Sequence, residues 1–329
     1  MPTRLSRSPR ASAPTRSLRT QHFLSVVDLT PSELGDVLTT AAMLKKERRA
    51  RVAGRPGASA LQGQHVALLF EKPSLRTRCT FEIAIRELGG DVITPSQDVA
   101  MGEREPIADV ARNLERWVSG VVIRTFEQDR LVQFAAAAPS LHVINALSDE
   151  EHPCQALADL LTLQEHLGDL RGRTVAFVGD GNNVATSLAQ GALMLGMHVH
   201  LATPDGYEFR PDIEAQLTAG ARLGATLTTF RHARDAVRGV AAVYTDAWTS
   251  MGREAEAQQR RKVFAPYQVN EALMAAAGDA VFMHCLPAHR GEEATDEVMD
   301  GPASIIFDQA ENRLHAQKGL LMLLMGGRQ

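Results

Sequence analysis

Residues 70–78 read FEKPSLRTR; they end the apolar run HVALLF and lead into an amphipathic run. We interpret the three parts as a strand, a tight loop and the start of a helix. The loop carries two hydroxyls, Ser74 and Thr77, and two guanidiniums, Arg76 and Arg78. A helix start offers free backbone N–H groups and a partial positive charge, and arginine matches phosphate oxygens in pairs. Taken alone, the loop fits either an anion site or an ordinary helix cap with two solvated arginines.

Strand-like and helix-like runs alternate along most of the chain. The runs that we expect to be strands are residues 65–70, 91–94, 120–125, 142–146, 174–179, 198–202, 226–230, 241–245, 280–285 and 304–307. Helices are expected between them, and a closing helix at about 311–325. Alternation of this kind predicts an α/β fold of two doubly wound parallel-sheet domains with a cleft between them. Ligands of such sheets bind beyond the carboxyl ends of the strands.

The chain of 329 residues, 44% of them hydrophobic, is long enough for two cores. We divide it into a disordered basic tail at residues 1–20, a first domain at 21–150, a second domain at 151–310, and a helix at 311–329 that returns to the first domain. The tail is rich in Arg and Ser and has no acidic residue. It fits a disordered tail on a cytoplasmic protein or, as an alternative, a transit peptide to the mitochondrial matrix.

Charge and cysteine usage narrow the class of protein. The net charge of −4 gives no field that would recruit nucleic acid, and no apolar run has the roughly 18 residues of a membrane helix. The three cysteines are widely separated and odd in number, which favours reduced thiols. We therefore expect no nucleic-acid or membrane partner.

Two segments place polar groups at expected element ends in the first half. Arg124 follows the apolar run GVVI, where it fits a second anion ligand or a surface ion pair. The segment EHPCQ at 151–155 begins a helix. Its His152 can donate to a carbonyl oxygen, and the Gln155 amide can pair with a small planar amide. The alternative is a capping histidine beside a buried cysteine.

Two loops follow strand-like runs in the second half. GDGNN at 179–183 resembles a dinucleotide loop, but Val184 replaces the third glycine and no acidic residue ends the next run. We therefore do not expect NAD to bind here. We expect the amides of the two asparagines to contact a polar ligand. In DAWTSMG at 246–252, a carboxylate can hold an ammonium and the Ser-Met-Gly turn can hold a carboxylate, which suits an amino acid. The alternative is a capped loop.

The segment HCLPAHRG at 284–291 ends another expected strand. A zinc site built from the neighbouring histidines and cysteines lacks a C-x-x-C or H-E-x-x-H pair, so we expect no metal. The thiol of Cys285 is expected to contact substrate directly.

Together these segments resemble the aspartate/ornithine carbamoyltransferase family, and within it the ornithine branch, from about residue 21 to the C-terminus. Five motifs of the family occur in order. They are S-x-R-T-R as SLRTR (74–78), H-P-x-Q as HPCQ (152–155), D-x-x-x-S-M-G as DAWTSMG (246–252), H-C-L-P as HCLP (284–287) and E-N-R as ENR (311–313).

The resemblance implies transfer of a carbamoyl group from carbamoyl phosphate, bound by the first domain, to the δ-amine of L-ornithine, bound by the second. It implies neither metal nor cofactor, and a homotrimer. The carbamoyl phosphate ligands would be Ser74, Leu75, Arg76, Thr77, Arg124, His152, Gln155, Cys285, Leu286 and Arg313. The ornithine ligands would be Asn183, Asp246, Ser250 and Met251. The catalytic groups among these would be Arg124, His152, Asp246, Cys285 and Arg313.

One loop departs from the family pattern. The family's D-x-Q-L-G-R-G-E reads DVAMGERE at 98–105, so Ala100 stands where a glutamine usually touches carbamoyl phosphate. An alternative is therefore that the protein is a subunit that binds the ligand but does not catalyse its turnover. Other rivals are transfer to aspartate, acetylated ornithine or putrescine, and a nicotinamide dehydrogenase. Arginine synthesis is expected rather than arginine breakdown.

Overall fold

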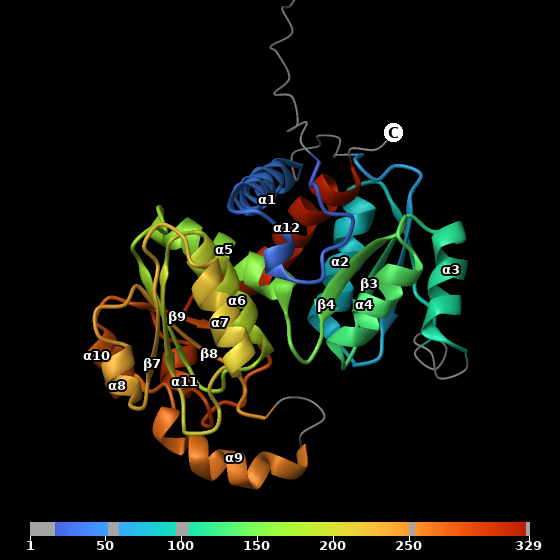
Figure 1. Ribbon diagram of the computed structural model, residues 1–329. Coiled ribbons are helices and arrows are strands. Elements are labelled where there is room, and N and C mark those ends of the chain that lie inside the picture. The colour runs from blue at the N-terminus through green and yellow to red at the C-terminus, as the bar shows by residue number, and fades with distance from the viewer. Residues whose placement is uncertain (1–16, 52–58, 97–104, 250–253, 327–329) are drawn as a thin grey trace, which may run out of the picture.

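The computed structural model describes residues 17–51, 59–96, 105–249 and 254–326. In these residues the chain forms two parallel β-sheets, each with helices on both faces (Figure 1). The α/β fold predicted from the alternating runs is confirmed.

The first sheet has four strands in the order β2-β1-β3-β4. They are β1 (His65–Phe70), β2 (Asp91–Ile93), β3 (Gly120–Arg124) and β4 (His142–Leu147). The second sheet has five strands in the order β7-β6-β5-β8-β9. They are β5 (Thr174–Val178), β6 (His198–Ala202), β7 (Leu227–Phe230), β8 (Ala242–Thr245) and β9 (Val281–His284).

Helices fill the connections between the strands. The α-helices of the first half are α1 (Pro31–Arg51), α2 (Leu75–Glu87), α3 (Ile107–Trp117), α4 (Gln128–Ala137) and α5 (Pro153–Leu167). Those of the second half are α6 (Asn183–Met194), α7 (Pro211–Gly220), α8 (Ala233–Ala236), α9 (Ala257–Phe264), α10 (Glu271–Ala277), α11 (Asp296–Met299) and α12 (Ile306–Met325). The short 3-10 helices are η1 (Val26–Asp28), η3 (Glu254–Glu256) and η4 (Ala265–Tyr267).

The largest differences from the sequence-based expectation are at the starts of helices α12 and α2. The strand expected at 304–307 is wrong, because Ser304 makes only an isolated bridge to Phe282 and α12 already begins at Ile306. Phe307 is 68% exposed, whereas a strand inside this sheet would be covered on both faces. Helix α2 was expected from Cys79, where the amphipathic run starts, but it begins at Leu75, so that Ser74 caps it.

Each sheet has one point at which the strand order reverses. In the first sheet this point lies between β1 and β3, so the loop after Phe70 and the side chain of Arg124 meet at one edge. In the second sheet it lies between β5 and β8, which brings together the loops that begin at Gly179 and Asp246. Ligands of open α/β sheets bind at such points.

One continuous hydrophobic core runs along one face of both sheets. It contains Val66 and Phe70 from the first sheet, Phe177 and Val199 from the second, and Leu320 from α12. Helix α12 packs against α1, α2 and α5, so the closing helix lies against the first sheet's helices as expected (Figure 1). Any side chain on α12 that faces the cleft is therefore fixed by packing on several helices.

The N-terminal segment joins the core earlier than we expected. Leu18 is buried, and its N–H donates to the carbonyl of Leu323 at 3.0 Å. The rest of the predicted tail, residues 1–16, lies outside the described residues, and the predicted domain boundaries stay predictions. None of the described helices combines the length and the apolarity needed to cross a membrane.

Candidate active site

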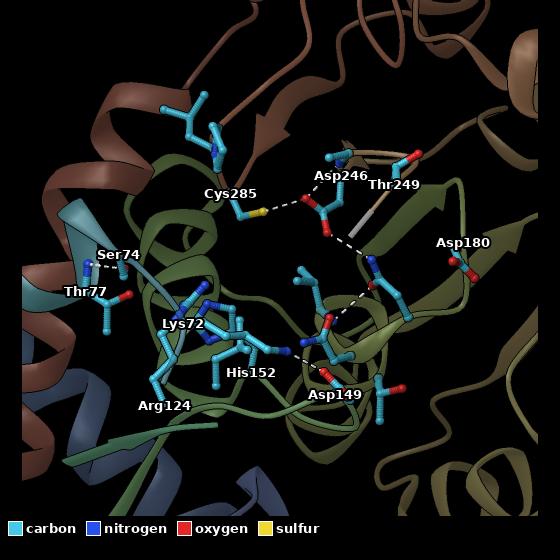
Figure 2. A pocket seen from close by; sticks show the side chains of 18 of the residues that line it. Lys72, Ser74, Thr77, Arg124, Asp149, His152, Asp180, Asp246, Thr249 and Cys285 are labelled. Carbon is cyan, nitrogen blue, oxygen red and sulfur yellow. Dashed lines mark hydrogen bonds and ion pairs between the residues drawn. The ribbon is translucent and has the colours of Figure 1, made fainter. Parts of the chain in front are cut away.

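A cleft of about 930 Å³ connects the reversal points of the two sheets (Figure 2). Most of the predicted site residues line it. They are Ser74, Leu75, Arg76, Thr77, Arg124, His152, Asn183, Asp246, Cys285, Leu286 and Arg313. The cleft therefore joins residues that are far apart in the sequence, as the strand-end argument requires.

The start of α2 forms one wall of the cleft. Ser74 has an extended backbone, and its Oγ accepts a hydrogen bond from the N–H of Thr77 at 3.2 Å. Leu75 is 76% exposed, so its side chain contributes no packing that would explain its place in the loop. The first turn of α2 thus presents backbone N–H groups and a hydroxyl at a helix N-terminus, where an anion is favoured.

Three guanidiniums gather at this wall. Arg124 ends β3 and is buried, and its pKa is lowered to about 10, first by burial and then by the charges of Arg313 and Arg76. Among the described residues, the Nε of Arg124 and the Nε of Arg313 have no hydrogen-bond partner. Buried donors without partners and like charges at close range both raise the free energy of the folded protein. A bound anion would remove both penalties.

Arg313 of α12 links the two sides of this wall. Its Nη2 donates to Oγ1 of Thr77 at 3.1 Å, and its Nη1 donates to Oε1 of Gln155 and lies 3.4 Å from Nε2 of His152. Gln155 also donates from Nε2 to Asp159 at 2.7 Å. Gln155 is buried and does not belong to the lining of the cleft, so it lies behind Arg313.

His152 stands at the start of α5 with its imidazole at the cleft. Burial lowers its pKa well below the ordinary value, and the charges of Arg313 and Arg124 lower it further. The ring is therefore neutral at pH 7. Because Arg313 can only donate, Nε2 accepts and the proton is assigned to Nδ1. That nitrogen is buried and has no hydrogen-bond partner among the described residues, so one donor is unsatisfied in the ligand-free protein.

A buried carboxylate supports His152 from behind. Glu151 Oε1 accepts from Ser25 Oγ at 2.9 Å and from Gln190 Nε2 at 2.5 Å. Ser187 Oγ donates to the other oxygen of Glu151 and accepts the N–H of His152 at 2.8 Å. Burial raises the pKa of Glu151 to about 7, from 4.5 for the exposed group.

This shift predicts a pH dependence of stability. The protonated form of Glu151 is favoured in the folded protein, so its stabilising contribution is complete below pH 4.5 and is lost as the pH rises to about 7. Glu151→Gln imitates the protonated form. At pH 8 we expect its free energy of unfolding to exceed that of the wild type by about 3 kcal/mol, and at pH 5 the excess should be much smaller.

Thermal denaturation at pH 5, 6.5 and 8 tests this prediction. The control is Val132→Ala, a largely exposed position that removes no titratable group, so its difference from the wild type should not depend on pH. A Glu151→Gln excess that stays constant from pH 5 to pH 8 would show that Glu151 does not titrate in this range.

The opposite wall of the cleft is centred on Asp246, directly after β8. Its Oδ1 accepts from the thiol of Cys285 at 2.9 Å, and its Oδ2 accepts from Nδ2 of Asn182 at 2.9 Å (Figure 2). Burial raises the pKa of Cys285 well above the ordinary value, and the charge of Asp246 raises it further. Cys285 is therefore a protonated thiol at pH 7, and Asp246 is the negative charge on this side.

Asn183 and Asp246 are the predicted ornithine ligands among the described residues. Asn183 lines the cleft, but its Nδ2 donates to the carbonyl of Ser148 at 2.6 Å, and it is Asn182 that contacts Asp246. Ser250 and Met251 lie outside the described residues, and so does Ala100.

Two residues were not predicted from the sequence: Lys72, which lines the cleft, and Arg260, which is buried behind its loops. Lys72 is buried, its Nζ lies 2.5 Å from Asp149 and 4.1 Å from the centre of the Phe126 ring, and it stands within the quoted stretch 70–78 (Figure 2). Arg260 on α9 is buried and donates to Asp180 and to the carbonyl of Trp248, which ties both loops of the second sheet together. Only its position in a polar helix was visible in the sequence.

Two groups of possible metal ligands lie near the cleft. They are Asp246 with His284 and Cys285, and His289 with Glu292 and Glu293. In the first group both nitrogens of His284 are engaged, and Cys285 is a thiol, whereas metals bind the thiolate. In the second, Arg261 holds Glu292 at 2.9 Å. The donor chemistry of both groups therefore favours hydrogen bonding.

Family comparisons cover nearly the whole chain. Residues 21–165 match the aspartate/ornithine carbamoyltransferase carbamoyl-P binding domain, and residues 171–324 match the Asp/Orn binding domain of the same family. The ornithine carbamoyltransferase of Symbiobacterium thermophilum is 49% identical over 313 residues, which cover 94% of this chain and 99% of that protein. The ornithine carbamoyltransferase of Acidothermus cellulolyticus is 50% identical over 315 residues, covering 94% and 98%.

Solved structures agree with the sequence relatives. The ornithine carbamoyltransferase from Pyrococcus furiosus superposes with a TM-score of 0.89 at 44% identity and covers 95% of this chain and 99% of its own. The one from Gloeobacter violaceus gives a TM-score of 0.83 at 45% identity, covering 93% and 99%. An N-acetyl-L-ornithine transcarbamylase gives a TM-score of 0.79 at 34% identity, covering 92% and 99%. The chain therefore belongs to the aspartate/ornithine carbamoyltransferase family.

Proposed function

We propose that this protein is an ornithine carbamoyltransferase, which transfers the carbamoyl group of carbamoyl phosphate to the δ-amine of L-ornithine and forms L-citrulline and phosphate. One observation carries the proposal. One wall of the cleft has positive charges and donors without hydrogen-bond partners, and the opposite wall has a carboxylate. Arg124 and Arg313 supply the unpaired donors. Asp246 supplies the carboxylate. A dianion and an ammonium fit these two walls in that order.

The phosphate end would bind at the start of α2. Ser74, Leu75 and Thr77 would contribute backbone N–H groups and hydroxyls, and Arg76 and Arg124 their guanidiniums. Negative charge grows on the leaving phosphate as the bond to the carbamoyl carbon breaks. Cations that are fixed before the reaction stabilise this charge without having to reorganise.

The carbamoyl oxygen would accept hydrogen bonds from Nδ1 of His152 and from Arg313. It gains negative charge when the amine attacks the carbon, so donors at this position lower the barrier. A neutral imidazole that donates its proton in a hydrogen bond keeps it throughout the step. Gln155 would act by orienting Arg313, in line with its place behind that residue.

The amine must lose a proton before it can attack. With a lysine-like pKa of about 10.4, deprotonation of the δ-ammonium at pH 7 requires about 4.6 kcal/mol. The Cys285 thiol donates to Asp246, and this pair can order the amine. The pair and the substrate phosphate are the two candidates for the group that accepts the proton. Asn183, Ser250 and Met251 are proposed to hold the amino-acid end of ornithine.

We also propose a homotrimer in the cytoplasm that serves arginine synthesis. The trimer is what the family resemblance implies, and synthesis is preferred to a catabolic role on general grounds. The placement is supported by free cysteines at 79, 154 and 285, as expected for a reducing compartment.

A carbamoyl transfer assay with four acceptors tests the function. The purified protein receives labelled carbamoyl phosphate with L-ornithine, N-acetyl-L-ornithine, putrescine or aspartate. We expect kcat/KM for ornithine to exceed the others by at least about 100-fold, because the two ends of ornithine each have a binding group and the rivals lack or mask one. Faster transfer to another acceptor would reject ornithine as the substrate. If no acceptor is carbamoylated, the result would support the alternative raised by Ala100, a subunit that binds ligand without catalysing transfer.

A further inference from the structure

A buried histidine–carboxylate pair lies behind the turn that follows β9. His284 and Glu293 are both 0% exposed. The Nδ1 of His284 accepts the backbone N–H of Leu286 at 2.8 Å. The Nε2 of His284 lies 3.1 Å from Oε1 of Glu293. The pair thus connects a buried carboxylate to the backbone of a residue that lines the cleft.

These contacts determine where the imidazole carries its proton. A backbone N–H can only donate, so Nδ1 must accept and carries no hydrogen. The single proton of the neutral ring is then on Nε2, where it is donated to Glu293. Moving it to Nδ1 would set two donors against each other at 2.8 Å. Glu293 therefore selects the tautomer that Leu286 needs.

Glu293 also closes the turn from its other end. The same Oε1 accepts the backbone N–H of His289 at 2.6 Å. From the core side, Oε1 of Gln309 accepts the backbone N–H of His284 at 3.0 Å. The segment from 284 to 289 is thus held at both ends by buried acceptors, and Leu286 has a φ of 57°, a conformation that a leucine adopts only when its surroundings impose it.

We propose that Glu293 is a positioning residue for the carbamoyl group, acting through His284 on Leu286. With its N–H committed to His284, Leu286 can offer a ligand only its carbonyl oxygen. A carbonyl oxygen accepts from the NH2 of a carbamoyl group, whereas an exposed N–H would repel it. The inference rests on the proposed function and adds a residue outside the cleft to the recognition of carbamoyl phosphate.

A purely structural role makes a different prediction. If the pair only stabilised the loop, its loss would lower the melting temperature and would affect all ligands of the folded protein alike. If it positions Leu286, its loss weakens ligands that carry a carbamoyl group and spares inorganic phosphate, which is expected to contact only the Arg76 and Arg124 side of the cleft. The ratio of the two dissociation constants separates these cases.

The experiment measures the dissociation constants of carbamoyl phosphate and inorganic phosphate by calorimetry at low temperature. For Glu293→Leu, which removes the oxygen that accepts from His284 and His289, we expect carbamoyl phosphate to bind about tenfold more weakly. Phosphate should stay within about twofold of the wild type. Glu293→Gln should keep the ratio of the wild type, because its amide oxygen can still accept both hydrogen bonds and Oε2 has no hydrogen-bond partner among the described residues. Val243→Ala, a buried change on neighbouring β8, is the control that lowers stability without touching the turn.

Equal weakening of both ligands in Glu293→Leu, or no weakening, would overturn the proposal. Should that variant not fold, His284→Asn takes its place. Its short amide keeps an acceptor for the N–H two residues on but does not reach Glu293, so the same selective loss is expected. These outcomes are independent of the acceptor assay. If the wild type turns over ornithine while the ratio is unchanged, only the role of Glu293 fails.

Discussion

Replacement of Arg124 by methionine is expected to abolish turnover and, at the same time, to raise the melting temperature of the ligand-free protein. Arg124 would stabilise the charge on the leaving phosphate, and loss of one such arginine lowers kcat by about 10⁴-fold in phosphoryl-transfer enzymes. Without ligand, however, its buried charge faces two other guanidiniums. Activity and stability should therefore change in opposite directions.

The shifted pKa gives the size of the stability effect. A pKa lowered from 12.5 to about 10 means that the charged Arg124 destabilises the folded protein relative to the unfolded chain at every pH below 10. The difference corresponds to about 3 kcal/mol, which for a chain of this size is a melting temperature higher by about 5 °C in Arg124→Met. Inorganic phosphate should raise the melting temperature of the wild type but hardly that of the variant.

Differential scanning fluorimetry with and without phosphate, together with steady-state kinetics, checks both halves of the prediction. Arg234→Met, on the exposed surface of α8, is the matched control and should leave kcat and the phosphate effect unchanged. If Arg124→Met is inactive but also less stable, Arg124 has a structural partner and the anion-site interpretation of this residue is wrong.

Replacement of Arg313 by lysine is expected to lower kcat by about 10³-fold, although the charge is kept. The guanidinium contacts Thr77, Gln155 and His152 at once, and one ammonium on a flexible stem cannot reproduce this fork. The affinity for inorganic phosphate should fall by no more than about fivefold, because the positive charge remains at the site. The loss therefore falls on the chemical step.

Single-turnover kinetics and phosphate titration separate these two effects. The control is Arg48→Lys on the half-exposed side of α1, where the guanidinium contacts Glu87 at 2.9 Å. The kcat of this variant should match that of the wild type. An Arg313→Lys variant with kcat within tenfold of the wild type would mean that the fork is dispensable and that charge alone suffices.

The fold was largely predictable because its signal is local. Each buried strand is an apolar run, and each polar residue that follows such a run lies at the carboxyl end of the sheet. This placed Arg124 and Asp246 correctly, since both directly follow or end strands beside a reversal point. The wrong strand at 304–307 shows the limit of this signal, because a short apolar run also suits the buried side of a helix start.

The details of the site depend on packing between distant segments. Gln155 lies behind Arg313, a contact between α5 and α12 that spans 158 positions in the sequence. Which of two adjacent asparagines faces Asp246 depends on the cap of α6. Asn182 accepts the N–H groups of Val184 and Ala185 through its Oδ1, and this leaves its Nδ2 for Asp246. Neither arrangement has a counterpart in residue spacing.

The most direct measurement of the central claim is a crystal structure with a bisubstrate compound in which a phosphonoacetyl group is joined to the δ-nitrogen of ornithine. We expect the phosphonate within hydrogen-bond distance of Arg76, Thr77 and Arg124, and the amino-acid end beside Asp246. A phosphonate bound elsewhere, or the compound bound in the reverse direction, would contradict this expectation.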